Sequence, residues 1–200
     1  MMKPTLKKIL AVFDLNHLND PSREPYVLNI VGVRTADDSG NSFNDWLCFF
    51  RNLEGAESDF YAFPATTDPG IYWRQNPENV DGVAIVVPGQ YPGLWALGKH
   101  KGYDALVQVG PIDVWRDNDR NNQLTTSKVD HGLFGINLHH ASALHRSSQV
   151  DKWSAGCQVI ANPNDFDIVV KLAHEQVQKT PERTFGYTLL EEQDINSVNA

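Results

Sequence analysis

The sequence predicts a mainly β fold, with an antiparallel sheet and one amphipathic helix. Most of the chain consists of short apolar runs rich in β-branched and aromatic residues, separated by Gly, Pro, Asn and Asp. This pattern is typical of strands joined by turns. One segment, 162–179, instead repeats apolar residues at steps of three and four, the spacing of a helix face. With 200 residues, 41% of them apolar, we expect a single domain over 1–200.

The N-terminal segment predicts the first strand. Ile9–Phe13 is an apolar run that follows Lys3, Lys7 and Lys8 and ends at Asp14. The run is shorter than the roughly 7–15 apolar residues of an export signal, so we expect a strand and no signal peptide. Nothing in the sequence approaches the roughly 18 uninterrupted apolar residues of a membrane span, so we expect no membrane insertion.

The other apolar runs predict further strands, and the connections between them favour antiparallel pairing. Gly110-Pro111 lies between two runs and is expected to form a tight hairpin, while Asp117–Asn122 is a polar loop. The expected strands are Tyr26–Val33, Trp46–Arg51, Val83–Val87, Ala105–Val109, Ile112–Trp115, Gly135–His139 and Phe185–Leu190.

The helix near 163–179 carries signals at both ends. Asn162 can cap it, Pro163 suits its first position, and Asp165 lies near its positive end. Thr180-Pro181 stops it.

Charge and cysteine content narrow the class of protein. Seventeen basic against 25 acidic residues give a net charge of −8, which disfavours nucleic acid as a partner. Cys48 and Cys157 are expected to be separate thiols, because a chain of this length has little need of a disulfide. Cys48 lies in an apolar run and reads as a core residue.

The stretch 135–160 carries the candidate chemistry. Cys157 follows the small residues Ser154-Ala155-Gly156, and Gly156 can adopt a backbone conformation that points N–H groups at a developing oxyanion. A thiol is mostly protonated at neutral pH, so a nucleophilic cysteine needs a nearby base. His139, at the end of an expected strand, is the natural candidate.

These residues resemble the active-site signature of L,D-transpeptidase (YkuD-like) catalytic domains. The signature is a His, about sixteen intervening residues, then Ser or Thr, His, Gly and Cys, and here His139 precedes Ser154-Ala155-Gly156-Cys157. The resemblance spans about 63–160, since 63–72 is similar to the family's Thr-rich turn and Pro-Gly stretch. It implies an antiparallel β-sandwich of the L,D-transpeptidase type.

The resemblance implies a role for each matching residue. Cys157 would be the nucleophile and His139 the general base, with the His140 carbonyl orienting the imidazole and N–H groups around Gly156 and Cys157 binding the oxyanion. The implied partner is a peptidoglycan stem peptide, which acylates the thiol. The acyl group then passes to an amine or to water, so transpeptidase, carboxypeptidase and endopeptidase outcomes stay open. No metal or organic cofactor is implied.

The sequence departs from the family pattern at Ala155, where His is usual, and at Gln158-Val159, where an apolar residue and an Arg or Asn are usual. Ser154, Arg146 and Trp153 are therefore candidate substrate contacts. Arg146, or His145 beside it, could act as a carboxylate clamp, and Trp153 could form a wall of the acyl site. Their alternatives are a solvated loop cation for Arg146 and a packing role for Trp153.

The resemblance implies that the place of action is the bacterial cell wall, on the periplasmic side of the membrane. Because no signal peptide is recognised, we expect another delivery route, such as release by a bacteriophage during lysis or transport in a virion.

Two other functions remain open at this point. One is a zinc hydrolase, because imidazole, carboxylate and thiolate groups of 130–157 could bind zinc. The other is a non-catalytic wall-binding or virion structural module, for which Ala155 and Val159 are the favourable features. In such a module the aromatic residues of Val87–Gln108 could form a platform for carbohydrate or peptide. His100 and Lys101 in that segment could equally border the catalytic cleft.

Overall fold

The protein is a mixed α/β structure built around a closed barrel. The computed structural model describes residues 1–200 apart from 21–23, 38–40, 55, 126–127 and 199–200. In this described part, eight strands close in the order β1-β11-β5-β6-β9-β10-β3-β2. The barrel strands are β1 (Asn29–Arg34), β2 (Asp45–Leu53), β3 (Ala56–Thr66), β5 (Gly89–His100), β6 (Tyr103–Gln108), β9 (Leu138–His140), β10 (Gln158–Ile160) and β11 (Thr184–Glu191).

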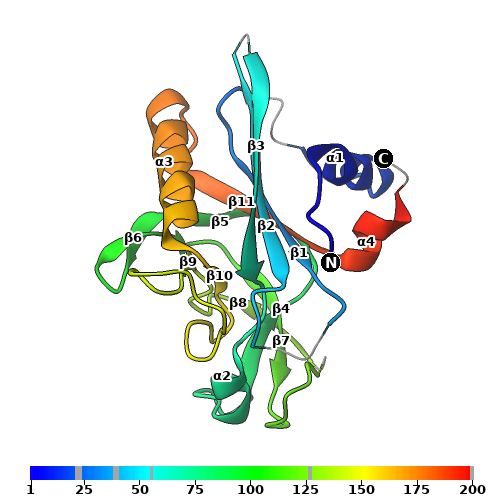
Figure 1. Ribbon diagram of the computed structural model, residues 1–200, viewed down its shortest axis with the longest axis vertical. Coiled ribbons are helices and arrows are strands. Elements are labelled where there is room, and N and C mark those ends of the chain that lie inside the picture. Colours follow the sequence, from blue (N-terminus) through cyan, green and yellow to red (C-terminus); the bar gives the residue numbers. More distant parts are fainter. Residues whose placement is uncertain (21–23, 38–40, 55, 126–127, 199–200) are drawn as a thin grey trace.

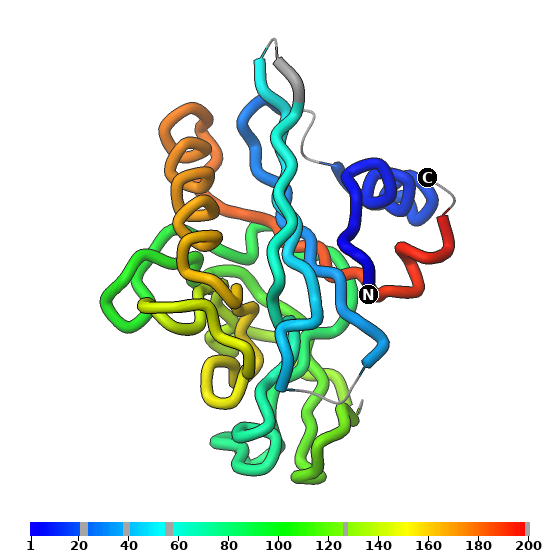
Figure 2. The backbone as a smooth tube through the Cα atoms, in the orientation of Figure 1, coloured from blue at the N-terminus to red at the C-terminus, as the bar shows by residue number. Residues whose placement is uncertain are grey.

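A small second sheet and four helices complete the described fold. The small sheet has the order β4-β7-β8. Helix α3 lies on one side of the barrel, whereas α1 and α4 lie together on the other side, near both chain ends (Figures 1 and 2). These elements are β4 (Val83–Val86), β7 (Ile112–Asp117), β8 (Val129–Gly132), α1 (Leu6–Leu15), α2 (Ile71–Gln75), α3 (Pro163–Lys179) and α4 (Glu192–Ser197).

The predicted antiparallel sandwich is wrong, because the main sheet is mixed and closes on itself. Strand β1 pairs with β11 in parallel, and β9 pairs with β10 in parallel, while the other neighbours in the barrel are antiparallel. Closure removes the free edges that a sandwich would keep.

The predicted hairpin at Gly110-Pro111 is also wrong. Strand β6 stays in the barrel and β7 belongs to the small sheet, so this dipeptide connects two sheets. The N–H groups of Val109 and Gly110 both donate to the Leu94 carbonyl. A Cβ at Gly110 would lie 2.6 Å from the Gly93 carbonyl oxygen, so the chain passes too close to β5 for any other residue.

The N-terminal segment is a helix and not the expected strand. Thr5 caps α1 by accepting a hydrogen bond from the Lys8 N–H. Leu6, Ile9 and Phe13 follow helical spacing, but the contiguous run Ile9–Phe13 also fits a buried strand, and periodicity cannot separate the two over so few residues. The apolar face of α1 packs on the outward face of β1 and β2, and this outer cluster includes Cys48.

The other main core lies on the opposite face of the strands. Alternation along β1 sends Ile30 to this core and Val31 to the outer cluster. Helix α3 contributes Phe166, Val169 and Leu172 to the same core. Asn162 caps α3 and Pro163 begins it, which confirms the predicted helix.

Arg34 connects the barrel to the small sheet. Its guanidinium donates to Thr67 Oγ1 and the Thr67 carbonyl after β3, and to the Val86 carbonyl of β4, at 2.9–3.1 Å. Its Nε also lies 2.8 Å from Asp68 Oδ1, although the N–H is directed at Thr67, so the contact with Asp68 is mainly an ion pair. Both charged side chains are buried.

We predict that Arg34→Lys lowers the free energy of unfolding by about 2–3 kcal/mol, because one ammonium group cannot replace a planar fork with several buried acceptors. Chemical denaturation measures this loss. The control is Lys99→Ala, which breaks the exposed ion pair with Asp104 and should cost less than about 1 kcal/mol. Equal losses for the two variants would show that the Arg34 contacts do not hold the sheets together.

Candidate functional site

The parallel pairing of β9 with β10 brings the segments that carry the two predicted catalytic residues side by side. His139 is the register partner of Val159, and the backbone carbonyl of Asn137 accepts a hydrogen bond from the Gln158 N–H at 2.9 Å. Cys157 lies two residues before Val159, in the turn that leads into β10. Tyr103 lies near both His139 and Cys157: its hydroxyl is 3.3 Å from His139 Nδ1, and its pKa is raised first by burial and then by the Cys157 charge. Strand β9 lies beside β6 and β10 lies beside β3, and both strands lie near the start of α3 (Figure 1).

His139 is buried and its ring is fixed from several sides. Its Nδ1 lies 2.8 Å from the His140 carbonyl oxygen and 3.3 Å from the Tyr103 hydroxyl. A carbonyl can only accept, so Nδ1 carries the proton and Nε2 keeps its lone pair. The His100 ring stacks on His139 with centroids 4.2 Å apart. The contact between His139 Nδ1 and the His140 carbonyl is the one that the family resemblance implies.

The surroundings of His139 favour its neutral form. Burial lowers its pKa to about 3, and the neighbouring His100, His140 and Lys101 charges act in the same direction, while the His140 carbonyl opposes them. The imidazole is therefore uncharged at neutral pH and can accept a proton at Nε2 only when a negative charge forms beside it.

The Cys157 thiol is also neutral at rest. Burial raises its pKa, whereas the Asn137 N–H and the Lys101 charge lower it. Sγ lies 3.4 Å from both the Asn137 nitrogen, from which it accepts, and the Gly135 carbonyl oxygen, to which it donates. Within the described residues, no hydrogen bond joins Sγ to the His139 ring. The thiol must turn from Gly135 before it can pass its proton to the imidazole.

The turn before Cys157 is held by its own polar groups. Ser154 is fully buried, and its hydroxyl donates to the Cys157 carbonyl and accepts the Gly156 N–H. Ser154, predicted to contact substrate, is thus placed as a brace of the turn. The Gly156 N–H is occupied, whereas no hydrogen bond in the described part of the chain uses the Cys157 N–H, so only the latter is available to a bound oxygen atom.

Gly156 is required for both conformation and space. Its φ is 129°, a region that favours glycine. A Cβ would lie 2.7 Å from the Ala84 carbonyl oxygen and 3.0 Å from the Ile136 side chain. The turn therefore packs directly on β4.

Gln158 anchors the turn from inside the barrel. Its Oε1 accepts the Tyr187 hydroxyl at 2.6 Å, and its Nε2 donates to the Gly156 carbonyl at 3.3 Å and more weakly to the Thr67 carbonyl at 3.5 Å. This residue departs from the family pattern, and its buried amide has partners on three sides.

The other predicted site residues lie at different depths. His140 is half-buried, with Tyr103 stacked on its ring at 4.2 Å. Trp153 is 40% exposed beside the turn. Arg146 is exposed in the loop between β9 and β10, and within the described residues no hydrogen bond or ion pair is formed by its side chain.

The structure adds Tyr103 and Asn137 to the site. Tyr103 comes from the hairpin between β5 and β6, where Lys101 and Gly102 have φ of 49° and 94°. The same hairpin brings in His100, whose Nδ1 lies 3.2 Å from Asn137 Nδ2. Only the placement of His100 and Lys101 at a cleft border was suggested by the sequence, because the contact depends on barrel closure.

The described residues offer little for the zinc alternative. Within them, no three His, Cys, Asp or Glu side chains come together as a metal-binding group. His131 instead pairs with Asp113 at 2.7 Å, and Asp130 pairs with Arg116 at 2.9 Å, both in the small sheet.

Comparisons with protein families and with curated proteins find no relative. No protein-family model matches the chain, and no curated protein matches it. No helix within the described residues has the length and apolar character needed to cross a membrane.

We predict that His139 makes the protein sensitive to acid. Its pKa is about 3 when folded and about 6.5 when unfolded, so protonation favours unfolding. The stabilising contribution is complete above pH 6.5 and is lost as the pH falls toward 3, at about 1.4 kcal/mol per pH unit. Chemical denaturation at pH 6.5 and 4.5 measures how far the free energy of unfolding falls between these pH values. This fall should be about 2–3 kcal/mol smaller for His139→Gln than for the native protein.

The matched control is His131→Gln, which replaces an exposed histidine and should keep the native acid sensitivity. An acid sensitivity unchanged by His139→Gln would mean that the His139 ring is accessible to water.

We further predict that Gly156→Ala destabilises the protein by about 2–5 kcal/mol, because it adds both backbone strain and a clash with Ala84. Gly102→Ala is the control, since its φ is also positive but its Cβ meets nothing within 4 Å. That change should cost only about 1 kcal/mol. Thermal or chemical denaturation compares the two, and similar losses would show that packing against β4 is unimportant.

Proposed function

We propose that this chain is a cysteine-dependent acyl-transfer enzyme that acts on peptidoglycan stem peptides. The observation that carries the proposal is the 2.8 Å contact between His139 Nδ1 and the His140 carbonyl. It fixes Nε2 as the proton acceptor, and Cys157 lies in the turn that leads into the neighbouring strand. The peptide substrate follows from the resemblance of His139 and Ser154-Ala155-Gly156-Cys157 to L,D-transpeptidase domains, and the place of action would be the cell wall.

The first half-reaction forms a thioester. The Cys157 proton passes to His139 Nε2, and Sγ attacks the peptide carbonyl carbon. The Cys157 N–H donates to the resulting oxyanion. Collapse of this intermediate breaks the C–N bond, and the leaving amine takes the proton from Nε2.

The second half-reaction releases the acyl group. An amine or water loses a proton to Nε2 and attacks the thioester carbonyl, and the Cys157 thiolate leaves and regains the proton. The same two side chains therefore support transfer to an amine or hydrolysis.

The electrostatics of the site fit a pair that is neutral at rest. Burial raises the Cys157 pKa, and the Asn137 N–H and the positive charge of Lys101 offset only part of this rise. A thiolate formed there would stabilise a protonated His139. Each charge is costly alone in this buried site, so proton transfer and nucleophilic attack are expected to be closely coupled.

We predict that Cys157→Ala abolishes turnover of purified tetrapeptide and pentapeptide muropeptides, because the acyl acceptor is lost. His139→Gln should slow turnover by about 10²–10⁴-fold, the usual contribution of a general base. Mass spectrometry of the products measures cleavage and exchange together.

The matched control is Cys48→Ala. Cys48 is fully buried in the outer cluster, so its loss should cost about 1–2 kcal/mol of stability and leave turnover intact. Full activity of Cys157→Ala would refute the nucleophile assignment, whereas an inactive native protein would favour a non-catalytic wall-binding or virion module.

A further inference from the structure

Gln108 holds the segment that contacts the Cys157 thiol, although it lies in another strand. It is the last residue of β6, whereas residues 133–137 connect β8 to β9 and form neither helix nor strand. Backbone groups outside regular structure still need hydrogen-bond partners where they are buried. Ile136 in this segment is only 2% exposed, so its N–H needs a partner from elsewhere in the chain.

The Gln108 side-chain amide supplies that partner and uses both of its ends. Its Oε1 accepts hydrogen bonds from the Phe134 and Ile136 N–H groups at 3.0 and 2.8 Å. Its Nε2 donates to the Gly132 and Gly110 carbonyls at 3.1 and 2.9 Å. These backbone groups also fix which end of the amide is oxygen, because an N–H can only donate and a carbonyl can only accept. The side chain thus ties the segment to β6 at several points.

The same segment holds the thiol from two sides. The Gly135 carbonyl lies between the two N–H groups that Gln108 binds, and it accepts a hydrogen bond from Cys157 Sγ at 3.4 Å. The Asn137 N–H follows along the chain and donates to Sγ at 3.4 Å. Movement of 134–137 would therefore change both contacts of the thiol at once.

The two contacts act differently on the two forms of the thiol. The Gly135 carbonyl can bind only the protonated form, and S–H is a weak donor. The Asn137 N–H can bind the thiolate, and a hydrogen bond to a charged group is roughly twice as strong as a neutral one. Burial raises the Cys157 pKa, and the Asn137 N–H is the first of the groups that offset this rise. Loss of both contacts should therefore disfavour the thiolate more than the thiol.

The Gln108 backbone also orders the histidine side of the site. Its N–H donates to Asn137 Oδ1 at 2.9 Å, which leaves Asn137 Nδ2 as the atom 3.2 Å from His100 Nδ1. An amide nitrogen can only donate, so His100 accepts at Nδ1 and carries its proton on Nε2. Burial lowers the His100 pKa, which favours a neutral ring where His100 stacks on His139.

From these contacts we propose that Gln108 is a positioning residue for the reaction at Cys157, because it fixes the segment that brackets the thiol. It acts through the backbone of 132–137 and not by contact with the substrate. This inference rests on the proposed function, since it concerns how the nucleophile of that reaction is prepared.

The test is Gln108→Met, which keeps the length of the side chain and removes its hydrogen bonds. Alkylation of Cys157 by iodoacetamide is followed as a function of pH, by mass spectrometry of the peptide that contains it. We expect the rate constant near neutral pH to fall about 10–100-fold, the effect of losing one hydrogen bond to a charged group, and the midpoint of the pH profile to rise. A purely structural role would lower stability without moving this midpoint, so an unchanged midpoint would overturn the proposal.

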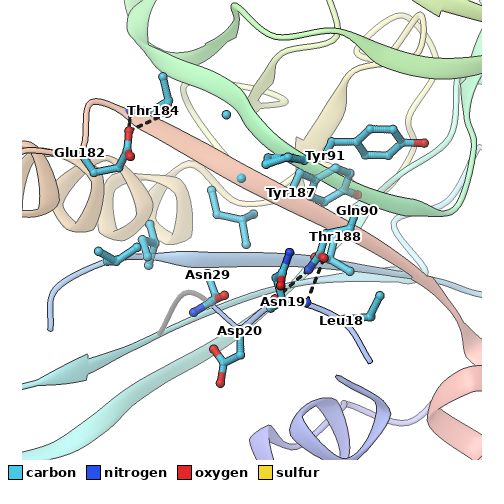
Figure 3. A pocket seen from close by; sticks show the side chains of 16 residues that line it. Leu18, Asn19, Asp20, Asn29, Gln90, Tyr91, Glu182, Thr184, Tyr187 and Thr188 are labelled. Atoms are coloured by element: carbon cyan, nitrogen blue, oxygen red, sulfur yellow. Dashed lines mark hydrogen bonds between the residues drawn. The ribbon is translucent and has the colours of Figure 1, made fainter. Parts of the chain in front are cut away.

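The matched control is Gln90→Met. Gln90 in β5 likewise holds a loop through its amide, which accepts the Asn19 N–H and donates to the Asn19 carbonyl and to Thr188 Oγ1 (Figure 3). These contacts border a cavity of about 570 Å³, and none of the described residues that line it belongs to 132–157. The control should lose stability and keep the native alkylation profile. Equal midpoint shifts in the two variants would refute a specific role for Gln108.

A measurement on the native protein applies if Gln108→Met does not fold. Exchange of backbone amide hydrogens, followed by NMR and corrected for intrinsic rates, should be at least about tenfold slower at Phe134 and Ile136 than at Gly135. The Gly135 N–H forms no hydrogen bond within the described residues, whereas the other two bind Gln108 Oε1. Equally fast exchange at all three would show that Gln108 does not hold the segment.

Failure of this inference and failure of the proposed function give different results. If the native protein turns over muropeptides and Gln108→Met keeps both native turnover and the native alkylation midpoint, the inference is wrong and the enzyme stands. If the native protein leaves muropeptides unchanged but the midpoint rises in Gln108→Met, the proposed reaction is wrong, and Gln108 still positions the thiol.

Discussion

The geometry of the candidate site depends on a buried polar network that runs from Tyr187 through Gln158 to Thr67. Gln158 holds the Gly156 carbonyl from one side, and Thr67 is held in turn by Arg34 and Asp45. Burial raises the pKa of Asp45 to about 7, with the Asp68 charge acting in the same direction. Buried polar groups of this kind are stable only when their partners are in place, so the network fixes one position for the turn that carries Cys157.

Burial also determines the resting state of His139 and Cys157, the proposed catalytic pair. It lowers the pKa of His139 and raises that of Cys157, so both side chains are neutral before a substrate arrives. The His140 carbonyl then selects the tautomer whose free lone pair is on Nε2. The fold thus supplies orientation and tautomer, while the negative charge that activates the base forms only when the thiol loses its proton.

Sequence patterns predicted those helices and strands whose signals lie within one short segment, such as helix α3 and strand β1. Helix α3 has a capping Asn162, a Pro163 start and a long apolar face, and strands such as β1 are runs of β-branched residues. Strand β5 is not among the expected strands, because Pro92, Gly93 and Gly98 interrupt its pattern. Barrel closure depends on the parallel β1–β11 pairing, which joins segments about 150 residues apart by register alone, and no local pattern encodes it.

The candidate pair at 139 and 157 could be proposed from one short stretch of sequence, and no comparison tests it. Tyr103 joins the pair only because the folded barrel brings β6 beside β9. The most direct test of the central claim is peptide mapping by mass spectrometry after native protein and a tetrapeptide muropeptide are mixed and rapidly quenched in acid. The account predicts a thioester adduct on the peptide that contains Cys157. An adduct on Cys48, or turnover with no covalent adduct at any quench time, would contradict it.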